Sequence, residues 1–215
     1  MNTRCSPPPA ALPLLALLAL LAFPAPASAG AETAVERCDR LASHPDDPGR
    51  VAPGVATAQM DKPTALEACR AAVELEPRNA RSRYQLARVL FYGGQNAPAI
   101  EQMRIAADAG YPQAQFVFGT FVARGREGAP QDICLAERYW RSAASGRQAA
   151  RVQYVRHALT GRFAGCADVA THGELEAMLS RAAAEARDFY ERLLIDDLTE
   201  ALAAAAVDGN QGNAA

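Results

Sequence analysis

This sequence of 215 residues has almost no excess of positive over negative charge or the reverse, few aromatic residues and no long apolar run. Its 22 Lys and Arg residues are nearly balanced by 24 Asp and Glu residues. Because nucleic-acid-binding proteins normally carry a marked basic excess, this balance excludes nucleic acid as the expected partner. The longest apolar run, residues 12–23, is shorter than the ~20 residues that a membrane span needs. Half of the residues are hydrophobic, which is enough for one domain with a real core.

The apolar run near the N-terminus has the features of a secretory signal peptide. Arg4 is the only charge before it, and the tripeptide ASA at 27–29 follows it as an A-x-A cleavage pattern. We therefore expect residues 1–29 to be removed on export, which leaves a mature chain from about Gly30 without a stable membrane anchor. The expected location is the bacterial periplasm or the extracellular medium.

Four cysteines lie after this leader. An even number of cysteines in an oxidising compartment indicates disulfides, and four of them allow three pairings. The separations are 31 residues between Cys38 and Cys69 and 32 residues between Cys134 and Cys166.

Alternating runs of β-branched residues, which would predict strands, are absent from the sequence. Ala, Leu, Arg, Glu and Gln recur at helical spacing between regularly placed Pro and Gly residues. The segments between these breakers have the length of ordinary helices, roughly 11 to 14 residues. The pattern predicts an all-α array of helical hairpins.

Two kinds of helix alternate in this array. One kind repeats alanine at a separation of two turns, and the copies follow one another at offsets of 34 and 37 residues. The other kind carries a central pair of residues and ends at a glycine. A period near 35 residues predicts an α-α superhelix, or solenoid, of about four hairpins. The repeated alanines are Ala65 and Ala72, Ala99 and Ala106, and Ala136 and Ala143. The central pairs are Leu86-Ala87, Phe118-Gly119 and Tyr154-Val155, and the glycines that end these helices are Gly93, Gly125 and Gly161.

These residues resemble two related repeat families. The tetratricopeptide pattern is matched in the first full unit, and the Sel-one-like pattern in the next, by AQFVFG at 114–119 and by the Asp132 to Ala144 segment. The resemblance covers about residues 62–161. Val155 stands where a glycine is usual, and one residue is missing before Gly146. The tetratricopeptide positions are Leu86, Ala87, Gly94, Ala99, Ile100, Met103 and Ala106, with Pro77 ending the preceding unit.

The resemblance implies a scaffold that binds a protein or peptide on the concave face formed by the first helix of each hairpin. Exported Sel-one-like members with cysteines typically pair the two helices of one repeat at short spacing, which this chain does not do. A β-lactamase-like activity has been ascribed to some cysteine-rich members.

Flanking segments complete the predicted array. Residues 30–61 are expected to hold a first helix with Cys38 and a Pro/Gly-rich loop. A capping box, Thr171-x-x-Glu174, begins a C-terminal capping helix within 162–207, in one segment or in two divided at Asp196-Asp197. Residues 208–215 are expected to be a disordered tail.

In this arrangement we favour the disulfides Cys38–Cys69 and Cys134–Cys166. The first would join the initial helix to the second across the loop, and the second would join the last loop to the preceding hairpin. Closing a loop of this length stabilises a fold by ~3–4 kcal/mol in the chain-entropy model.

The sequence contains only weak patterns for a catalytic site or a metal site. Cys134, His157 and Asp168 could form a thiol nucleophile group, and Cys134, His157, Cys166 and His172 could bind zinc. The ligand spacing is loose, and S-x-x-K, G-x-S-x-G and phosphate-loop motifs are absent from the sequence. We expect no catalysis, no metal and no cofactor. The alternative is a hydrolase, β-lactamase-like or thiol peptidase-like, on the same fold.

A partner-binding surface is the main functional hypothesis. Arg81, Tyr84, Arg88 and Tyr92 follow one another at spacings of 3, 4 and 4, so they share one helical face. Arginines beside aromatic residues suit an acidic segment or the C-terminal carboxylate of a protein or peptide. The alternative is that Tyr84 and Phe116 pack between helices and the arginines are only solvated. In later repeats the surface would continue through Phe116, Thr120 and Arg156.

Overall fold

The structure, a computed structural model, describes residues 1–2 and 31–212, and the secondary structure in this part of the chain is entirely helical. The all-α prediction is therefore confirmed. The expected signal peptide lies outside the described residues except for its first two. The helices are α1 (Ala34–Ala42), α2 (Lys62–Leu75), α3 (Ala80–Tyr92), α4 (Asn96–Asp108), α5 (Pro112–Arg124), α6 (Ile133–Ala144), α7 (Gln148–Leu159), α8 (His172–Ala184) and α9 (Phe189–Gly212), with a short 3₁₀ turn η1 (Thr57–Gln59).

Helix boundaries follow local chemistry. The Thr33 and Thr171 side chains accept from the backbone N–H three residues on, and the glutamates there complete capping boxes. Asp61 caps α2, which has a proline in its first turn. At the other end of a helix, Gly125 takes a left-handed conformation (φ 60°) that ends α5.

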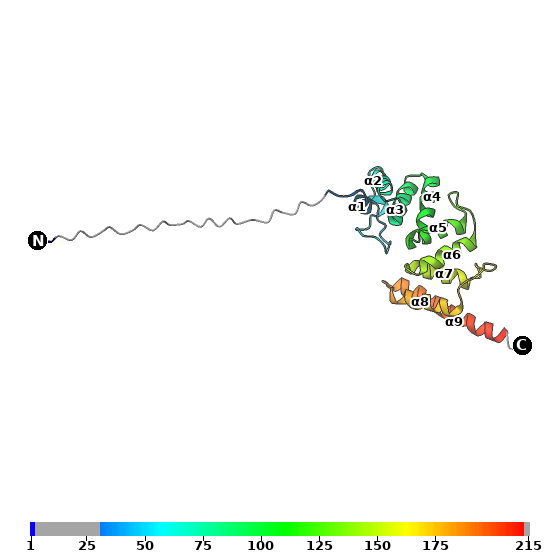
Figure 1. Ribbon diagram of the computed structural model, residues 1–215. Coiled ribbons are helices and arrows are strands. Elements are labelled where there is room, and N and C mark those ends of the chain that lie inside the picture. Colours follow the sequence, from blue (N-terminus) through cyan, green and yellow to red (C-terminus); the bar gives the residue numbers. More distant parts are fainter. Residues whose placement is uncertain (3–30, 213–215) are drawn as a thin grey trace. The chain divides into compact units, whose positions relative to one another are not determined.

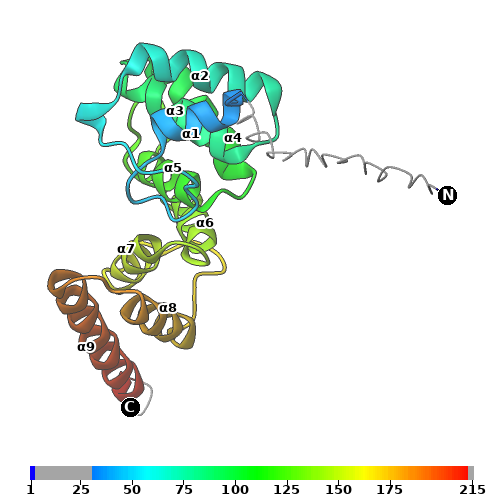
Figure 2. The same cartoon turned by 90° about the vertical axis from the view of Figure 1, so that its left-hand side faces the viewer.

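Consecutive helices pack as hairpins, in the pairs α1–α2, α3–α4, α5–α6 and α7–α8, and each hairpin stacks on the next (Figures 1 and 2). Within this array α1 also contacts α3, and α7 contacts α9, so the first helices of the hairpins follow one another along one side. This is the predicted α-α solenoid of about four hairpins with a long helix at its C-terminal end.

Small residues allow the helices to approach closely. All six repeated alanines of α2, α4 and α6 are buried, and so are the central pairs of α3, α5 and α7. The tightest approach is between α5 and α6, where the Trp140 ring lies against Gly119 and its indole N–H donates to the Phe116 carbonyl at 3.2 Å.

The C-terminal region consists of two helices, so the two-segment alternative is the one observed. The predicted division at Asp196-Asp197 is wrong, because both residues lie inside α9 and the break is at residues 185–188. There the Asp188 carboxylate accepts from the Glu191 N–H at 2.9 Å and so begins a new helix. The tail predicted to be disordered begins at residue 208, but residues 208–212 are helical and belong to α9, which ends at Gly212. Residues 213–215 lie outside the described residues.

A buried arginine holds this break in place. Arg151, which is 2% exposed, donates to the Ala144 carbonyl at 2.7 Å and to the Glu185 carboxylate at 2.6 Å. The Arg151 side chain thus satisfies a backbone carbonyl at the end of α6 and fixes the end of α8.

Two disulfides are present, Cys38–Cys69 and Cys134–Cys166, which are the pairs that the repeats favour. Their Cα atoms are 4.7 and 5.2 Å apart, within the usual range. None of the helices in the described part of the chain is long and apolar enough to cross a membrane.

The Gly119 contact leads to a test of helix packing. A Cβ atom at this position would lie 2.9 Å from the Trp140 ring, so Gly119→Ala should destabilise the fold by about 1–3 kcal/mol. Gly173→Ala is the matched control, because a Cβ atom there meets no atom within 4 Å. Urea unfolding measures both variants. Equal stability of the two would contradict the close α5–α6 packing.

Candidate functional site

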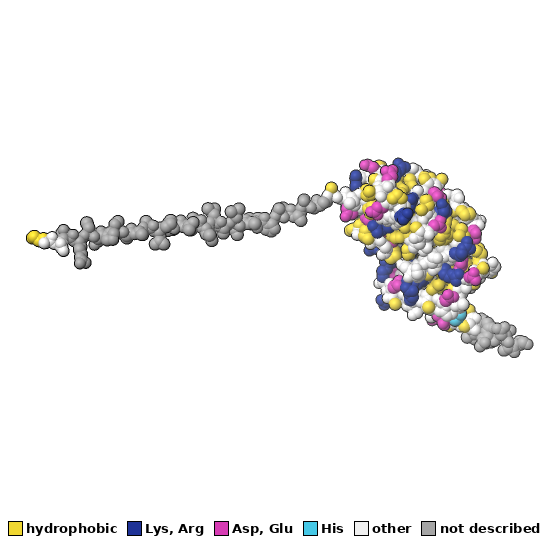
Figure 3. All heavy atoms as spheres, viewed as in Figure 1, with side chains coloured by type: hydrophobic (Ala, Val, Ile, Leu, Met, Phe, Trp, Pro, Cys, Tyr) yellow, Lys and Arg dark blue, Asp and Glu magenta, His cyan; other side chains and the backbone are white. Residues whose placement is uncertain are grey.

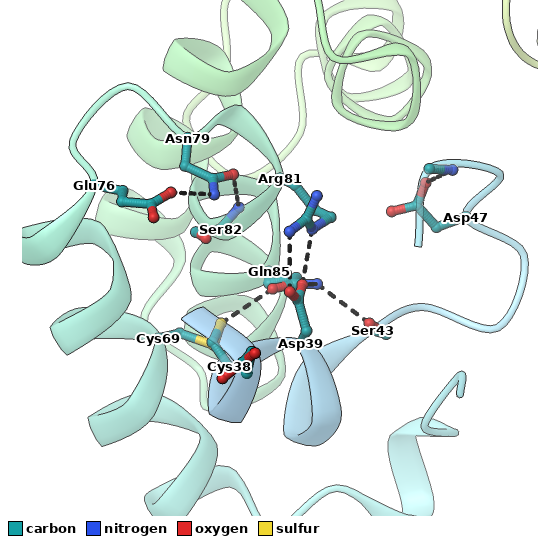
Figure 4. A network of polar contacts seen from close by, with 12 residues as sticks. Cys38, Asp39, Ser43, Asp47, Cys69, Glu76, Asn79, Arg81, Ser82 and Gln85 are labelled. Carbon is teal, nitrogen blue, oxygen red and sulfur yellow. Dashed lines mark hydrogen bonds and ion pairs between the residues drawn. A yellow bond between two sulfur atoms is a disulfide. The ribbon is translucent and has the colours of Figure 1, made fainter. Parts of the chain in front are cut away.

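The inner side of α3 is covered by the N-terminal segment of the same chain (Figure 4). Arg81 forms a bidentate ion pair with the buried Asp39 of α1, at 2.8 and 3.0 Å. Gln85 donates to Asp39 at 2.7 Å and to the Ser43 hydroxyl at 3.3 Å. Its Oε1 atom lies 3.1 Å from the Cys38 sulfur, a contact without a proton because that sulfur belongs to the disulfide. These contacts fix α1 on α3.

Arg88 lies deeper in the same place and is 4% exposed. Its guanidinium donates to three backbone carbonyls, those of Ala42 at 3.0 Å, Ser43 at 3.2 Å and Val55 at 2.6 Å. Its Nε atom is buried without a hydrogen-bond partner, and burial lowers the pKa of Arg88. Because this buried cation is stabilised only by carbonyl dipoles, the segment that supplies the carbonyls must be placed accurately.

That loop, residues 43–60, is called the strap here. It continues past α3 to the beginnings of α5 and α7. The buried Asp47 accepts from the Tyr111 hydroxyl at 2.7 Å, and Arg147 donates to the Asp46 carbonyl at 2.6 Å. Burial and the Asp47 carboxylate raise the pKa of Tyr111, so this hydroxyl keeps its proton and remains a donor. The strap therefore occupies one edge of the inner face of the array.

The structure divides the six predicted binding residues into two groups. Arg81, Tyr84 and Arg88 lie beneath the N-terminal segment, and the Tyr84 hydroxyl accepts from the Gln113 amide at 3.1 Å. Tyr84 is thus packed between helices, as the alternative described, whereas Arg81 and Arg88 are held in intramolecular contacts and are not merely solvated. Accessible surface remains at Tyr92, Phe116 and Arg156.

The accessible part of the inner face contains two hollows that share Phe116 as a lining residue. One has a volume of about 220 Å³, and the other, of about 260 Å³, lies between α5, α7 and α9. We call the two together the groove. Its first half is lined by Phe91, Phe116, Thr120, Phe121, Arg124 and Arg126, and its second half by Phe116, Val152, Gln153, Arg156, Leu194 and Ile195.

The groove has an apolar floor and a basic edge. Its arginines lie at or just beyond the ends of α5 and α7, where cations also complement the helix dipoles. Arg124 and Arg156 have no carboxylate within ion-pair distance among the described residues, and Arg126 reaches Glu127 only at 3.8 Å. Glu191, at the far edge, is already paired with Arg187 at 2.9 Å. The groove therefore carries a net positive charge.

Arg147 connects the strap to the groove. Its guanidinium lies over the Phe116 ring, 4.6 Å from the centroid, while it donates to the Asp46 carbonyl. Sequence reasoning missed this residue because it precedes α7 in a turn, outside every helical face. Arg124, Val152 and Leu194 were also missed, although Val152 and Arg156 have the i, i+4 spacing of one face.

A third hollow, of about 270 Å³, lies between the strap and the α8–α9 turn. Its charged lining mixes both signs, and Glu185 and Arg187 in it are already paired. The face in Figure 3 likewise shows basic and acidic side chains intermingled with hydrophobic ones. No region of one sign dominates that face.

The cysteines that a thiol nucleophile or a zinc site would need are not free in this fold. Cys134 and Cys166 are bonded to each other, so neither supplies a thiolate to His157. Among the described residues, no group of three or more His, Cys, Asp and Glu side chains is placed to hold a metal ion. His157 instead stacks on Trp140, with ring centroids 4.8 Å apart and planes 5° from parallel.

No protein-family model matches this sequence, and no curated protein matches it. Among solved structures the fold is that of a Sel1-like, tetratricopeptide-like helical repeat. The similar structure is the crystal structure of a Sel1 repeat protein from Oxalobacter formigenes, with 23% sequence identity and a TM-score of 0.50. The match covers 61% of this chain and 97% of that chain. The predicted fold, an α-α solenoid of helical repeats, is therefore confirmed.

The strap can be tested through its contact with α5. Tyr111→Phe removes the donor to the buried Asp47, which then keeps only the Gly49 N–H, at a cost of about 1–3 kcal/mol. We expect faster amide exchange at residues 46–50 and faster tryptic cleavage after the exposed Arg50. Tyr92→Phe, an exposed tyrosine of α3, is the control. Unchanged cleavage in Tyr111→Phe would contradict the anchoring of the strap.

His157 predicts a pH dependence of stability. Burial, and then Arg162, Arg156 and Arg124, lower its pKa to about 4. The unfolded chain, with an ordinary pKa of about 6.5, then binds this proton more readily than the folded chain. The stability contributed by neutral His157 is thus complete above about pH 6.5 and is lost as the pH falls toward 4.

His157→Phe keeps a ring on Trp140 and removes the titrating group. Between about pH 7 and about pH 5 the unmodified chain should lose about 1 kcal/mol more than this variant, after allowance for partial exposure. Urea unfolding at both pH values measures the difference. Parallel losses in the two proteins would show that His157 is not held neutral.

Proposed function

We propose that this chain is an exported scaffold that binds a protein or peptide segment in the groove and that it does not act as an enzyme. The observation that carries the proposal is the pair of hollows on either side of α5 that share Phe116 in their lining, because concave and largely apolar surfaces with a few placed polar groups are the usual binding sites. The Sel1-like fold supports the proposal through its curved inner face.

An acidic partner is the one whose charge fits the groove. Arg124, Arg126 and Arg156 present guanidinium groups beside aromatic and aliphatic side chains. Guanidinium groups bind carboxylates with two parallel hydrogen bonds, and Phe116 and Phe121 supply apolar area next to them. A segment with carboxylates at one end and apolar side chains in the middle would match both features.

The strap supports this proposal as an internal example. It is a largely irregular segment that passes α3 and the starts of α5 and α7, and it is held there by Asp47 on Tyr111 and by carbonyls on Arg88 and Arg147. The same kinds of contact are open to an external segment in the rest of the inner face. A partner-binding role for Arg81 and Arg88 would require displacement of α1 and the strap, which cover them, and Tyr84 is bonded to Gln113 of α5. We therefore place the contact at Phe116 and Arg156, which line the groove, while the exposed Tyr92 lies outside this lining.

Export is part of the proposal. The leader at residues 1–29 and the two disulfides fit an oxidising compartment, the periplasm or the extracellular medium. N-terminal sequencing of the chain recovered from that compartment tests it, and retention of the leader would contradict it. A hydrolase remains the disfavoured alternative, since the groove holds no nucleophile and base pair among its lining residues.

The groove can be tested with peptides selected from a random library on the folded chain. Val152→Glu and Arg156→Glu place negative charge on the floor and the edge of the groove, and each should weaken a selected peptide at least about tenfold. Fluorescence anisotropy measures the affinities. Added salt should weaken the unmodified complex, because the arginine contacts are exposed.

Arg138→Glu is the matched control, since Arg138 is an exposed arginine of α6 outside the groove. Its affinity should stay within about twofold of the unmodified chain. Thermal unfolding of all three variants shows whether the fold is retained. Selected peptides that bind the groove variants as tightly as the control would refute this site.

A further inference from the structure

Four large apolar side chains are exposed within six residues at the beginning of α9. Phe189 is 70% exposed, Tyr190 79%, Leu193 47% and Leu194 40%. The opposite side of the helix is packed, since Ile195, Leu198 and Leu202 are buried in the main core cluster. Helix α9 thus has two apolar sides, of which the fold covers one. Contiguous exposed apolar residues of this kind mark an interaction surface.

The position of α9 in the array explains why this side is open. Each of α1, α3, α5 and α7 is followed by a second helix that packs antiparallel against it. Helix α9 packs on both helices of the α7–α8 hairpin, as α3 packs on both helices of the α1–α2 hairpin (Figure 2). It therefore has the place of a first helix, and none of the described residues forms a second helix on its open side. Tyr190, Leu193, Leu194 and Asp197 follow one another at the spacing of one helical face.

We propose that a second copy of this chain covers the open side, with its own α9 as the missing antiparallel helix. A two-fold axis perpendicular to α9 makes the two helices antiparallel, which is the orientation that every hairpin in the array already uses. The surface is then self-complementary, as an isologous interface requires.

The charges along α9 favour one register for this pair. When Leu193 of one copy lies opposite Leu194 of the other, Tyr190 lies opposite Asp197. Each Tyr190 hydroxyl then meets a carboxylate at the rim of an apolar centre. A pair centred at Asp197 instead would place the two Asp197 carboxylates against each other.

The size of the surface predicts a weak dimer. A large aromatic side chain buries about 150–250 Å², so two aromatic residues and two leucines per copy bring the interface to roughly the lower limit of specific complexes, about 1,200 Å² in total. We therefore expect dissociation in the micromolar range rather than a permanent dimer.

Sedimentation velocity on the mature chain tests the proposal. The unmodified chain should shift from monomer to dimer between about 1 and about 200 μM, and Leu193→Glu should raise the dissociation constant at least about tenfold. Leu75→Glu is the matched control, since Leu75 is 62% exposed at the other end of the array. A monomer throughout this range overturns the proposal, and so does a dimer that Leu193→Glu leaves unchanged.

Cross-linking tests the register. In the proposed pair two Leu193→Cys side chains lie near the axis, whereas two Ala204→Cys positions are roughly 30 Å apart at 1.5 Å of rise per residue. A short bis-maleimide should link the first variant with itself and leave the second monomeric. Equal linking of both variants overturns the register.

The binding proposal and the dimer proposal fail separately. The substituted residue Leu193 does not line the groove, although its neighbour Leu194 does, and peptide affinity is measured below the concentration at which the dimer forms. Loss of dimerisation with normal peptide binding, or the reverse, therefore identifies which of the two is wrong.

Discussion

Each hairpin of this array can bury its apolar side only against its neighbours, and this constraint governs the rest of the structure. The inner hairpins are covered on both sides, so close contacts such as Gly119 against Trp140 suffice for them. The two ends need other solutions. At the N-terminal end, the short α1 is held by the Cys38–Cys69 disulfide and by Asp39. At the C-terminal end, α9 covers the α7–α8 hairpin and leaves an exposed apolar side of its own.

Buried charge explains why the N-terminal segment is part of the fold. The inner side of α3 carries Arg81 and Arg88, and the dry environment beneath α1 would not accept either cation without acceptors. Asp39 supplies a carboxylate to Arg81, while Arg88 depends on the carbonyls of Ala42, Ser43 and Val55. Because these acceptors lie at the end of α1, at the start of the strap and at Val55 farther along it, the arginine helps to specify the path of the loop.

The sequence allowed good prediction of features that depend on neighbouring residues, and poorer prediction of features that depend on distant ones. The helices, their caps, the buried alanines and the cysteine pairs follow from spacing within one or two repeats. The spacing of Arg81, Tyr84 and Arg88 likewise indicated a shared face. It could not indicate what covers that face, because the strap is placed by contacts across 64 residues to Tyr111 and 101 residues to Arg147. The break before α9 had a local signal, Asp188-x-x-Glu191, that the alanine-rich context obscured.

Arg147 shows how these two kinds of constraint meet at the candidate site. One guanidinium holds the strap through the Asp46 carbonyl and covers the ring of Phe116, at the point where the two hollows of the groove join. A segment that inserts a side chain at Phe116 must either stack with this guanidinium or displace it from the ring. In both cases the free energy of binding depends on the position of Arg147, and therefore on the order of the strap that Arg147 holds. By reciprocity, whatever loosens the strap also alters the surface that the groove presents.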